Sequence, residues 1–234
     1  MNIEPIGIIK SCFKQKFGIP RQPGLVPEAK ATLELLGAYN QPNMVKGLAS
    51  FSHIWLLFQF HATADKGWQP MVRPPRLGGN KQMGVLATRS MFRPNGMGLS
   101  VCKLDFVNID SEFVTLGLSG IDLLDETPVF DVKPYLPYVD SIEDAQGAYA
   151  TEKPAAQHEV GFSELALSQC LTAQQHIQEN LIELISQILA QDPRPAFHQG
   201  KYNDREYTMQ LYNLDITWCY KNKKVEVVKV LSLC

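Results

Sequence analysis

The chain has 234 residues, of which 45% are hydrophobic and 20% charged, with 16 glycines and 15 prolines. This is the composition of a folded protein, and it excludes a disordered or collagen-like chain. The net charge of -2 hides an asymmetry: residues 1–103 carry 13 basic and 4 acidic side chains (+9), residues 104–198 carry 3 and 16 (-13), and residues 199–234 carry 6 and 4 (+2).

The basic side chains concentrate between residues 66 and 104, where seven Lys and Arg occur without an acidic residue. Such a block binds a polyanion, or it is a solvated face balanced by the acidic half of the chain, and charge alone favours neither. No apolar run approaches the roughly 18 residues of a membrane span, and residues 1–5 show no signal-peptide pattern. The five cysteines are scattered without metal-ligand spacing. We therefore expect a cytoplasmic protein with no membrane contact and no metal.

Short apolar segments separated by turn residues dominate residues 1–140. Their lengths and their β-branched and aromatic content predict strands. No amphipathic helix of three turns lies between them, so antiparallel pairing is favoured over a parallel α/β fold, and a closed barrel would leave no exposed edge. We predict a mainly β fold with a β-barrel over residues 1–140. The predicted strands are Ile6–Ile9, Ala31–Leu35, Ile54–Phe60, Gly84–Ala87, Leu99–Ile109, Phe113–Leu118 and Pro128–Lys133.

Residues 141–159 are polar and contain Pro154, a pattern typical of a connector. Beyond it, Thr172 and Gln175 can form a capping box, and apolar residues from 177 to 188 fall on one face of a helix that Pro193 ends.

An alternating segment, Leu214–Tyr220, follows, and a polar turn at 221–224 leads into a return strand, Val225–Val230. We predict a small α+β C-terminal domain over residues 160–234.

The usual signatures of nucleotide, zinc and hydrolase chemistry are absent: there is no GxGxxG after a strand, no Walker motif, no HExxH and no GxSxG. A cofactor site of the Rossmann type is therefore disfavoured. The strands are instead joined by loops in which proline stiffens the backbone, glycine permits close approach and arginine supplies planar donors. These loops predict a preformed polar site. They are Ile19–Gly24, Phe60–Thr63, Val72–Gly79, Ala87–Ser90, Phe92–Asn95 and Gly120–Asp125.

Long motifs occur at Phe51–Trp55, Arg73–Gly79, Gly84–Arg89, Phe92–Asn95 and Thr127–Tyr135. Together they closely resemble the TsaA-like family, which includes bacterial tRNA methyltransferases acting on N6-threonylcarbamoyladenosine beside the anticodon.

The likeness spans residues 3–140, and Asp192–Pro195 also resembles the C-terminal domain of bacterial members. Two residues depart from the pattern: Gly96 stands where proline is expected, and Glu126 where glycine is expected.

The resemblance implies a single-sheet β-barrel that binds S-adenosylmethionine, and a homodimer. Arg21 or Arg89 would pair with the carboxylate of the cofactor. Three of the expected contacts also have a structural alternative. Arg21 would hold its own loop in place, Arg89 would pair with the acidic segment, and His61 would be a packed histidine at the end of a strand. By motif, the expected cofactor contacts are Pro20, Arg21, Gln22, His61, Ala62, Arg89, Leu99, Ile121, Asp122, Leu123 and Leu124.

Methyl transfer to the N6 nitrogen depends mostly on positioning, but the N–H proton needs an acceptor. We expect Asp125 in that role, with a turn cap as its structural alternative.

Phosphate contacts give RNA affinity. We expect them from Arg73, Arg76, Lys81 and Arg93. Lys133 would read the threonyl carboxylate, unless it pairs with Asp131.

The resulting prediction is an S-adenosylmethionine-dependent tRNA N6-methyltransferase. Two alternatives remain open: a non-enzymatic module that binds S-adenosylmethionine or RNA, and a methyltransferase for another small acceptor.

Overall fold

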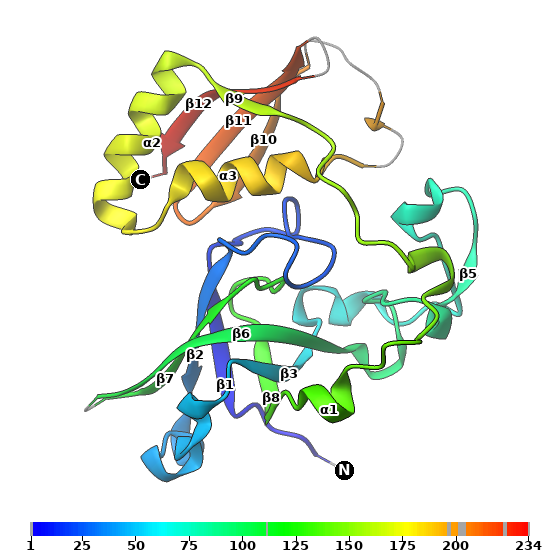
Figure 1. The fold of residues 1–234 in the computed structure, drawn as a ribbon, viewed down its shortest axis with the longest axis vertical. Helices are drawn as coiled ribbons and strands as arrows, with labels where there is room; N and C mark the ends of the chain where they lie inside the picture. The colour runs from blue at the N-terminus through cyan, green and yellow to red at the C-terminus, as the bar shows by residue number, and fades with distance from the viewer. Residues whose placement is uncertain (1, 111, 196–197, 201–204, 222–223, 234) are drawn as a thin grey trace.

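The computed structural model describes residues 2–110, 112–195, 198–200, 205–221 and 224–233. Two units lie one above the other along the longest axis of the molecule (Figure 1). The lower unit is a β-barrel, and the upper unit is a sheet with two helices. No helix in the described ranges is long and apolar enough to cross a membrane.

Six strands close the barrel in the order β1-β2-β7-β6-β3-β8, and all neighbours are antiparallel. Side chains alternate between the interior and the outer face, as in β3, where Ile54, Leu56 and Phe58 are buried. The predicted mainly β barrel is confirmed. The strands are β1 Gly7–Ser11, β2 Lys30–Leu35, β3 His53–Gln59, β6 Met97–Ile109, β7 Val114–Ser119 and β8 Pro128–Pro134.

The predicted strand Gly84–Ala87 is wrong. Only β5 (Met83–Gly84) is extended, pairing with β4 (Met71–Val72), and Val85–Ala87 forms a 3₁₀ turn. Thr88 closes this turn, because its amide and its hydroxyl both donate to the carbonyl of Val85, at 3.1 and 2.8 Å. A side chain that bonds the backbone locally competes with strand pairing.

The upper unit is a four-stranded sheet in the order β10-β11-β12-β9, with β9 parallel to β12. Two helices, α2 and α3, pack on it (Figure 1). The alternating segment and the return strand are confirmed as β11 and β12, whereas residues 222–223 of the predicted turn lie outside the described residues. The elements are β9 Val160–Phe162, α2 Glu164–Ile177, α3 Leu181–Ala190, β10 Tyr207–Leu211, β11 Leu214–Lys221 and β12 Lys224–Ser232.

The single predicted helix is two helices, and the predicted capping box is wrong. Thr172 lies inside α2, and its hydroxyl donates to the carbonyl of Ser168 at 3.0 Å. The true caps are Ser163, which accepts from the amide of Ala166 at 3.1 Å, and Asn180 at the start of α3. The left-handed backbone of Gln178 (φ 58°) ends α2.

A loop that follows β1 joins the two units (Figure 1). The carbonyl of Cys12 accepts from the amide of Tyr212 at 2.8 Å, and Phe17 stacks on Trp218 with ring centroids 5.8 Å apart. The loop is therefore held by both units. At the start of β2, Lys30 adds a separate ion pair between the units, with Glu179 at 2.6 Å.

The chain between the units contains the short helix α1 (Pro137–Asp140) and then runs along one side of the molecule (Figure 1). Two contacts tie its second half: Arg76 donates to the carbonyl of Glu152, and the amide of Gln157 donates to the carbonyl of Ala190 at 2.7 Å.

Candidate cofactor and RNA site

Strand register brings the predicted loops to one end of the barrel. Gln59 pairs with Met97, and Phe58 pairs with Val129, so the loop after β3 and the loop before β8 leave the sheet together. The loop Ile19–Gly24 joins them, because the amide of Gly24 donates to the carbonyl of Gly120 at 2.7 Å. Both glycines have positive φ (72° and 68°), a backbone conformation that glycine adopts without strain. Glycine therefore permits the turns that bring these two loops together.

Four polar side chains meet there, three from separate loops and Ser100 from strand β6. Arg89 Nη1 donates to Gln22 Oε1 at 2.5 Å, and Ser100 Oγ donates to Asp122 Oδ1 at 2.7 Å. Burial raises the pKa of Asp122 to about 6, although the Ser100 hydrogen bond and the charge of Arg89 act in the opposite direction. Desolvation therefore outweighs the nearby cation, and Asp122 titrates close to neutral pH.

His61 and Ala62 lie in the adjoining turn. Lys16 Nζ donates to the carbonyl of Ala62 at 2.6 Å, and Thr127 Oγ1 lies 3.5 Å from His61 Nδ1 while donating to the carbonyl of Leu124 at 2.6 Å. Burial lowers the pKa of His61. The imidazole is therefore neutral at physiological pH and can donate or accept a hydrogen bond.

The apolar members of the predicted set lie differently. Pro20, Ile121 and Leu123 are buried, so their backbone atoms are what a ligand would meet. Leu99 lies on the outer face of β6 and is 54% exposed, while its neighbour Ser100 points inward to Asp122. Ten of the eleven predicted contacts thus come from the loops at this end of the barrel, and Leu99 alone comes from the outer face of a strand.

Asp125, the predicted proton acceptor, is held by structural contacts. Its Oδ1 accepts from the amide of Ser11 at 2.8 Å, and its Oδ2 lies 2.5 Å from Lys14 Nζ. These contacts tie the loop before β8 to the end of β1. The structure places Asp125 beside the site with both oxygens engaged.

The predicted RNA-binding cations fall into two groups. Arg93 is turned inward and donates to the carbonyl of Thr88 at 3.0 Å, and Arg76 is bonded to the connector. Arg73 and Lys81 are exposed.

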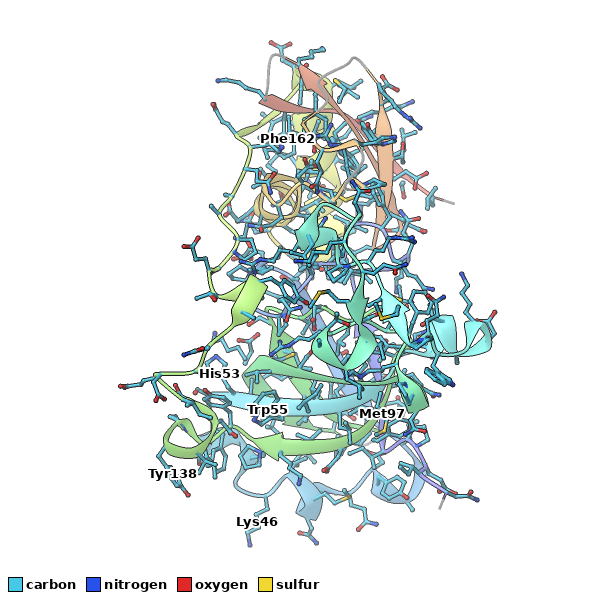
Figure 2. The ribbon with its side chains drawn as sticks, turned by 90° about the vertical axis from the view of Figure 1, so that its right-hand side faces the viewer. Lys46, His53, Trp55, Met97, Tyr138 and Phe162 are labelled. Atoms are coloured by element: carbon cyan, nitrogen blue, oxygen red, sulfur yellow. The ribbon has the colours of Figure 1, made fainter. Side chains whose placement is uncertain are left out.

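Lys133 is not brought to this cluster. It pairs across the sheet with Trp55 and lies 3.9 Å from Asp131. Figure 2 shows His53, which begins β3, and Met97 on opposite sides of the barrel, and Lys133 belongs to the side of His53.

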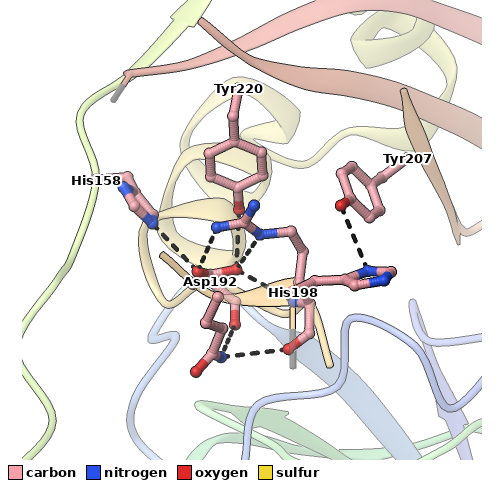
Figure 3. A network of polar contacts seen from close by, with 7 residues as sticks. His158, Asp192, His198, Tyr207 and Tyr220 are labelled. Atoms are coloured by element: carbon pink, nitrogen blue, oxygen red, sulfur yellow. Dashed lines mark hydrogen bonds and ion pairs between the residues drawn. The ribbon is translucent and has the colours of Figure 1, made fainter. Parts of the chain in front are cut away.

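A buried polar network occupies the start of the segment that follows α3 (Figure 3). Asp192 and Arg194 are 1% and 0% exposed. Arg194 Nε and Nη2 donate to the two oxygens of Asp192 at 2.8 Å each, and the hydroxyl of Tyr220 donates to Oδ1 at 3.0 Å. His158 lies 3.3 Å from Oδ2. The sequence showed Asp192 and Arg194 only as part of a likeness to the family, and residue type gave no signal of their burial, because Asp and Arg are mostly exposed unless paired.

The donor set fits S-adenosylmethionine. Arg89 provides a cation for a carboxylate, and Asp122 provides an anion for an ammonium or a sulfonium group. Within the described residues, no three His, Cys, Asp or Glu side chains come together as metal ligands would.

Comparison with known proteins agrees with this geometry. Residues 8–141 match the family model described as tRNA-methyltransferase O N-terminal domain, and residues 155–233 match the one described as TrmO C-terminal domain. The chain belongs to the tRNA-methyltransferase O family. The resemblance predicted from the motifs is therefore confirmed for both parts of the chain.

Relatives in this family match over nearly the whole length. The chain is 46% identical to the tRNA (adenine(37)-N6)-methyltransferase of Escherichia coli (strain K12), covering 96% of this chain and 95% of that protein. It is 46% identical to the putative S-adenosylmethionine-dependent methyltransferase RcsF of Pseudomonas aeruginosa, with 99% and 97% covered. The crystal structure of TrmO from Pseudomonas aeruginosa superposes with a TM-score of 0.84 at 40% identity, covering 99% of this chain and 98% of that one.

Proposed function

We propose that this protein is an S-adenosylmethionine-dependent tRNA methyltransferase that methylates the N6 nitrogen of N6-threonylcarbamoyladenosine next to the anticodon. The observation that carries the proposal is the 46% identity, over 96% of the chain, to a tRNA (adenine(37)-N6)-methyltransferase. The polar loops at one barrel end supply the matching chemistry.

When bound, S-adenosylmethionine supplies an electrophilic methyl group. Arg89, held by Gln22 at 2.5 Å, is placed to bind a carboxylate through its planar donors. The carbonyl group of the buried Ile121 and the neutral His61 supply hydrogen bonds without added charge. Fixing both reactants in this rigid set of loops provides most of the rate acceleration, because methyl transfer needs an in-line approach.

The N6 nitrogen forms a bond to the methyl carbon as the bond from carbon to sulfur breaks, and the N–H proton leaves the nitrogen. Asp122 is better suited than Asp125 to accept this proton. Its pKa of about 6 leaves it ionised yet basic near neutral pH. Asp125 is ion-paired with Lys14 and bonded to the backbone of Ser11.

The basic segment between residues 66 and 104 supports binding to the tRNA backbone. Arg73, Arg76 and Lys81 are exposed on loops of this segment, and several such contacts produce affinity with strong salt dependence. With a tRNA substrate, the protein would act in the cytoplasm.

A homodimer is part of the proposal. Two large apolar side chains on the outer face of β6 are half exposed, Leu99 (54%) and Phe106 (51%). A second copy would bury them, and it would also bring a surface against Leu99, whose side chain points away from Ser100 and Asp122. Light scattering of the eluted protein tests this, and a monomer mass at micromolar concentration would contradict it.

The deciding experiment incubates the protein with methyl-labelled S-adenosylmethionine and bulk tRNA, and then digests the RNA to nucleosides. Label is expected in a single nucleoside, the N6-methylated threonylcarbamoyladenosine. Transfer RNA from cells unable to make the threonylcarbamoyl group is the matched control and should remain unlabelled. A binding module would give complex formation without label, and a methyltransferase for a small acceptor would leave the RNA unlabelled in both samples.

A further inference from the structure

Residues 66–93, between β3 and β6, carry four exposed apolar side chains that the candidate site does not use. Trp68 is 60% exposed, Met71 46%, Leu86 77% and Met91 36%. We call these four side chains the apolar patch. A single apolar side chain on a surface needs no explanation, whereas a group of them indicates a binding surface.

Backbone hydrogen bonds hold the chain segments of the apolar patch side by side. The amide of Val85 donates to the carbonyl of Pro70, and the amide of Gln69 donates to the carbonyl of Phe92, each at 3.0 Å. Each of these four bonded residues is the sequence neighbour of one member of the patch, and β4 pairs with β5 between the two bonds. The patch therefore belongs to one region of fixed backbone, near β5 at the edge of the molecule (Figure 1).

Positive charge surrounds the apolar patch. Residues 66–93 contain six Lys and Arg and no acidic side chain. Arg73 and Lys81 are exposed, and neither is engaged in a hydrogen bond or an ion pair with another described residue. An exposed aromatic ring among such cations favours single-stranded nucleic acid, whose phosphates pair with the cations while its bases stack on the ring. A second copy of this chain, packed patch to patch, would bring like charges together.

The apolar patch is joined directly to the cofactor loops. Phe92, which accepts from the amide of Gln69, lies in the loop that follows Arg89. The segment that presents Trp68 is therefore tied to the segment that presents Arg89. A nucleotide bound at the patch would be close in the RNA chain to the nucleotide whose base meets the cofactor beside Asp122.

Methylation of a base in an RNA loop leaves its neighbour with an unstacked face. The acceptor base has to be turned out of the stack before it reaches the cofactor, and this unstacking costs free energy. Another planar group that takes the vacated place recovers part of that cost. The indole ring of Trp68 is exposed, and within the part of the chain that the structure describes no other aromatic ring stacks on it.

We propose that Trp68 stacks on a base that flanks the acceptor adenosine, in the place left by the adenine that has turned into the site. The inference rests on the proposed function and adds a positioning residue to it. Trp68 holds the RNA in register, and it touches neither the cofactor nor the reacting nitrogen. Arg73 and Lys81 bind phosphates of the same RNA segment.

The first test measures the affinity of the intact protein for an anticodon-arm RNA that carries threonylcarbamoyladenosine. Trp68→Ala should weaken binding by about 5- to 150-fold, the usual loss for one base–aromatic stack. Trp68→Leu, which keeps an apolar side chain without a planar ring, should also lose affinity, and Trp68→Phe should restore most of it. Calorimetry should give the same affinity for S-adenosylmethionine in all variants.

Trp55→Phe is the matched control. Trp55 lies on β3, where its indole nitrogen donates to Asp140 at 3.0 Å, and it is not part of the apolar patch. This variant should bind the RNA as tightly as the wild type does.

The second test reports on the stack itself. The fluorescent base 2-aminopurine, which is quenched when it stacks, replaces each base that flanks the acceptor in turn. At one of the two positions the probe should stay quenched in complex with the wild type and with Trp68→Phe, and it should become bright in complex with Trp68→Ala at saturating protein. A purely structural role of Trp68 would not produce this difference between bound RNAs.

Four results would overturn the proposal. Unchanged RNA affinity in Trp68→Ala would exclude the stack, and wild-type affinity in Trp68→Leu would replace it by a general apolar contact. Weaker binding of S-adenosylmethionine to Trp68→Ala would place the ring in the cofactor site. Conversion of a dimer to a monomer in Trp68→Ala, by light scattering, would place it between two copies of the chain.

Trp68 is exposed, so thermal melting should confirm that its variants fold. Failure of the proposed function is separate: the wild type would then label no tRNA, whereas failure of this inference leaves labelling by the wild type intact.

Discussion

Replacing Asp122 with asparagine should stabilise the protein at neutral and higher pH. Burial raises the pKa of this carboxyl to about 6 from an ordinary value of 3.8. Each unit of difference between the folded and unfolded pKa corresponds to about 1.4 kcal/mol, so ionisation of Asp122 destabilises the folded state by on the order of 3 kcal/mol. The raised pKa stabilises the protonated folded form, and this contribution is complete below about pH 4 and disappears as the pH rises through about 6. Asparagine keeps the shape and still accepts the hydrogen bond from Ser100, but carries no charge.

Urea unfolding of the wild type and Asp122→Asn near pH 4.5 and near pH 8 measures the effect. The variant should be more stable by about 3 kcal/mol near pH 8 and by only about 1 kcal/mol near pH 4.5. Methyl transfer by the variant should fall at the same time, and the wild-type rate should rise as the pH passes through about 6, where Asp122 loses its proton. A stability difference that does not widen with pH would refute the argument from burial.

Asp125→Asn is the control in the same loop. This substitution removes the ion pair with Lys14. It relieves no desolvation cost, because both oxygens of the Asp125 carboxylate have partners. We expect it to be destabilising by about 1 kcal/mol at both pH values. A gain in stability that matches Asp122→Asn would contradict the distinction between the two carboxylates.

Three further variants address the other parts of the site. Arg89→Ala should weaken S-adenosylmethionine binding by about 10- to 150-fold, as measured by calorimetry, and unchanged affinity would remove Arg89 from the cofactor site. Combined Arg76→Ala and Lys81→Ala should lower the salt slope of tRNA binding by about 0.7–0.9 for each phosphate that the variant no longer neutralises, and a constant slope would place both side chains off the RNA. Asp192→Ala leaves the buried Arg194 without its carboxylate and should cost about 3–5 kcal/mol in urea unfolding, whereas wild-type stability would show the network to be dispensable.

The sequence alone was sufficient to predict most of the strands, because a half-buried strand alternates apolar and polar residues whichever strand it pairs with. Leu214–Tyr220 shows this, since its apolar side chains are the buried ones in β11. The motif likeness was also sufficient for the family, because both family models match.

The structure explains one departure from the family motif. Glu126, which stands where glycine is expected, has a φ of 61°. The left-handed backbone explains the expected glycine. The same loop accommodates glutamate here, with its carboxylate paired to Lys10 at 2.5 Å.

Predictions from local sequence patterns were wrong at two positions where a threonine side chain can form either of two local hydrogen bonds. Thr172 matched a capping box by spacing, yet it bonds within α2 because Ser163 caps the helix earlier. The segment at Val85 looked like a strand, yet Thr88 closes a turn on it. In both places a nearby hydrogen bond, which sequence spacing does not reveal, decided the conformation.

The identity of the loops that hold the candidate site followed from the sequence alone, whereas the role of each side chain depends on contacts between distant residues. Gln22 meets Arg89, and Ser100 meets Asp122, only after the barrel has closed. The pKa of Asp122 depends on how many atoms surround it, which composition and spacing do not record. Arg21 likewise faces a cavity that forms only when the second unit docks on the loop after β1. The sequence thus determined which chemical groups are present, and tertiary packing decided which of them are buried, paired or left available to a ligand.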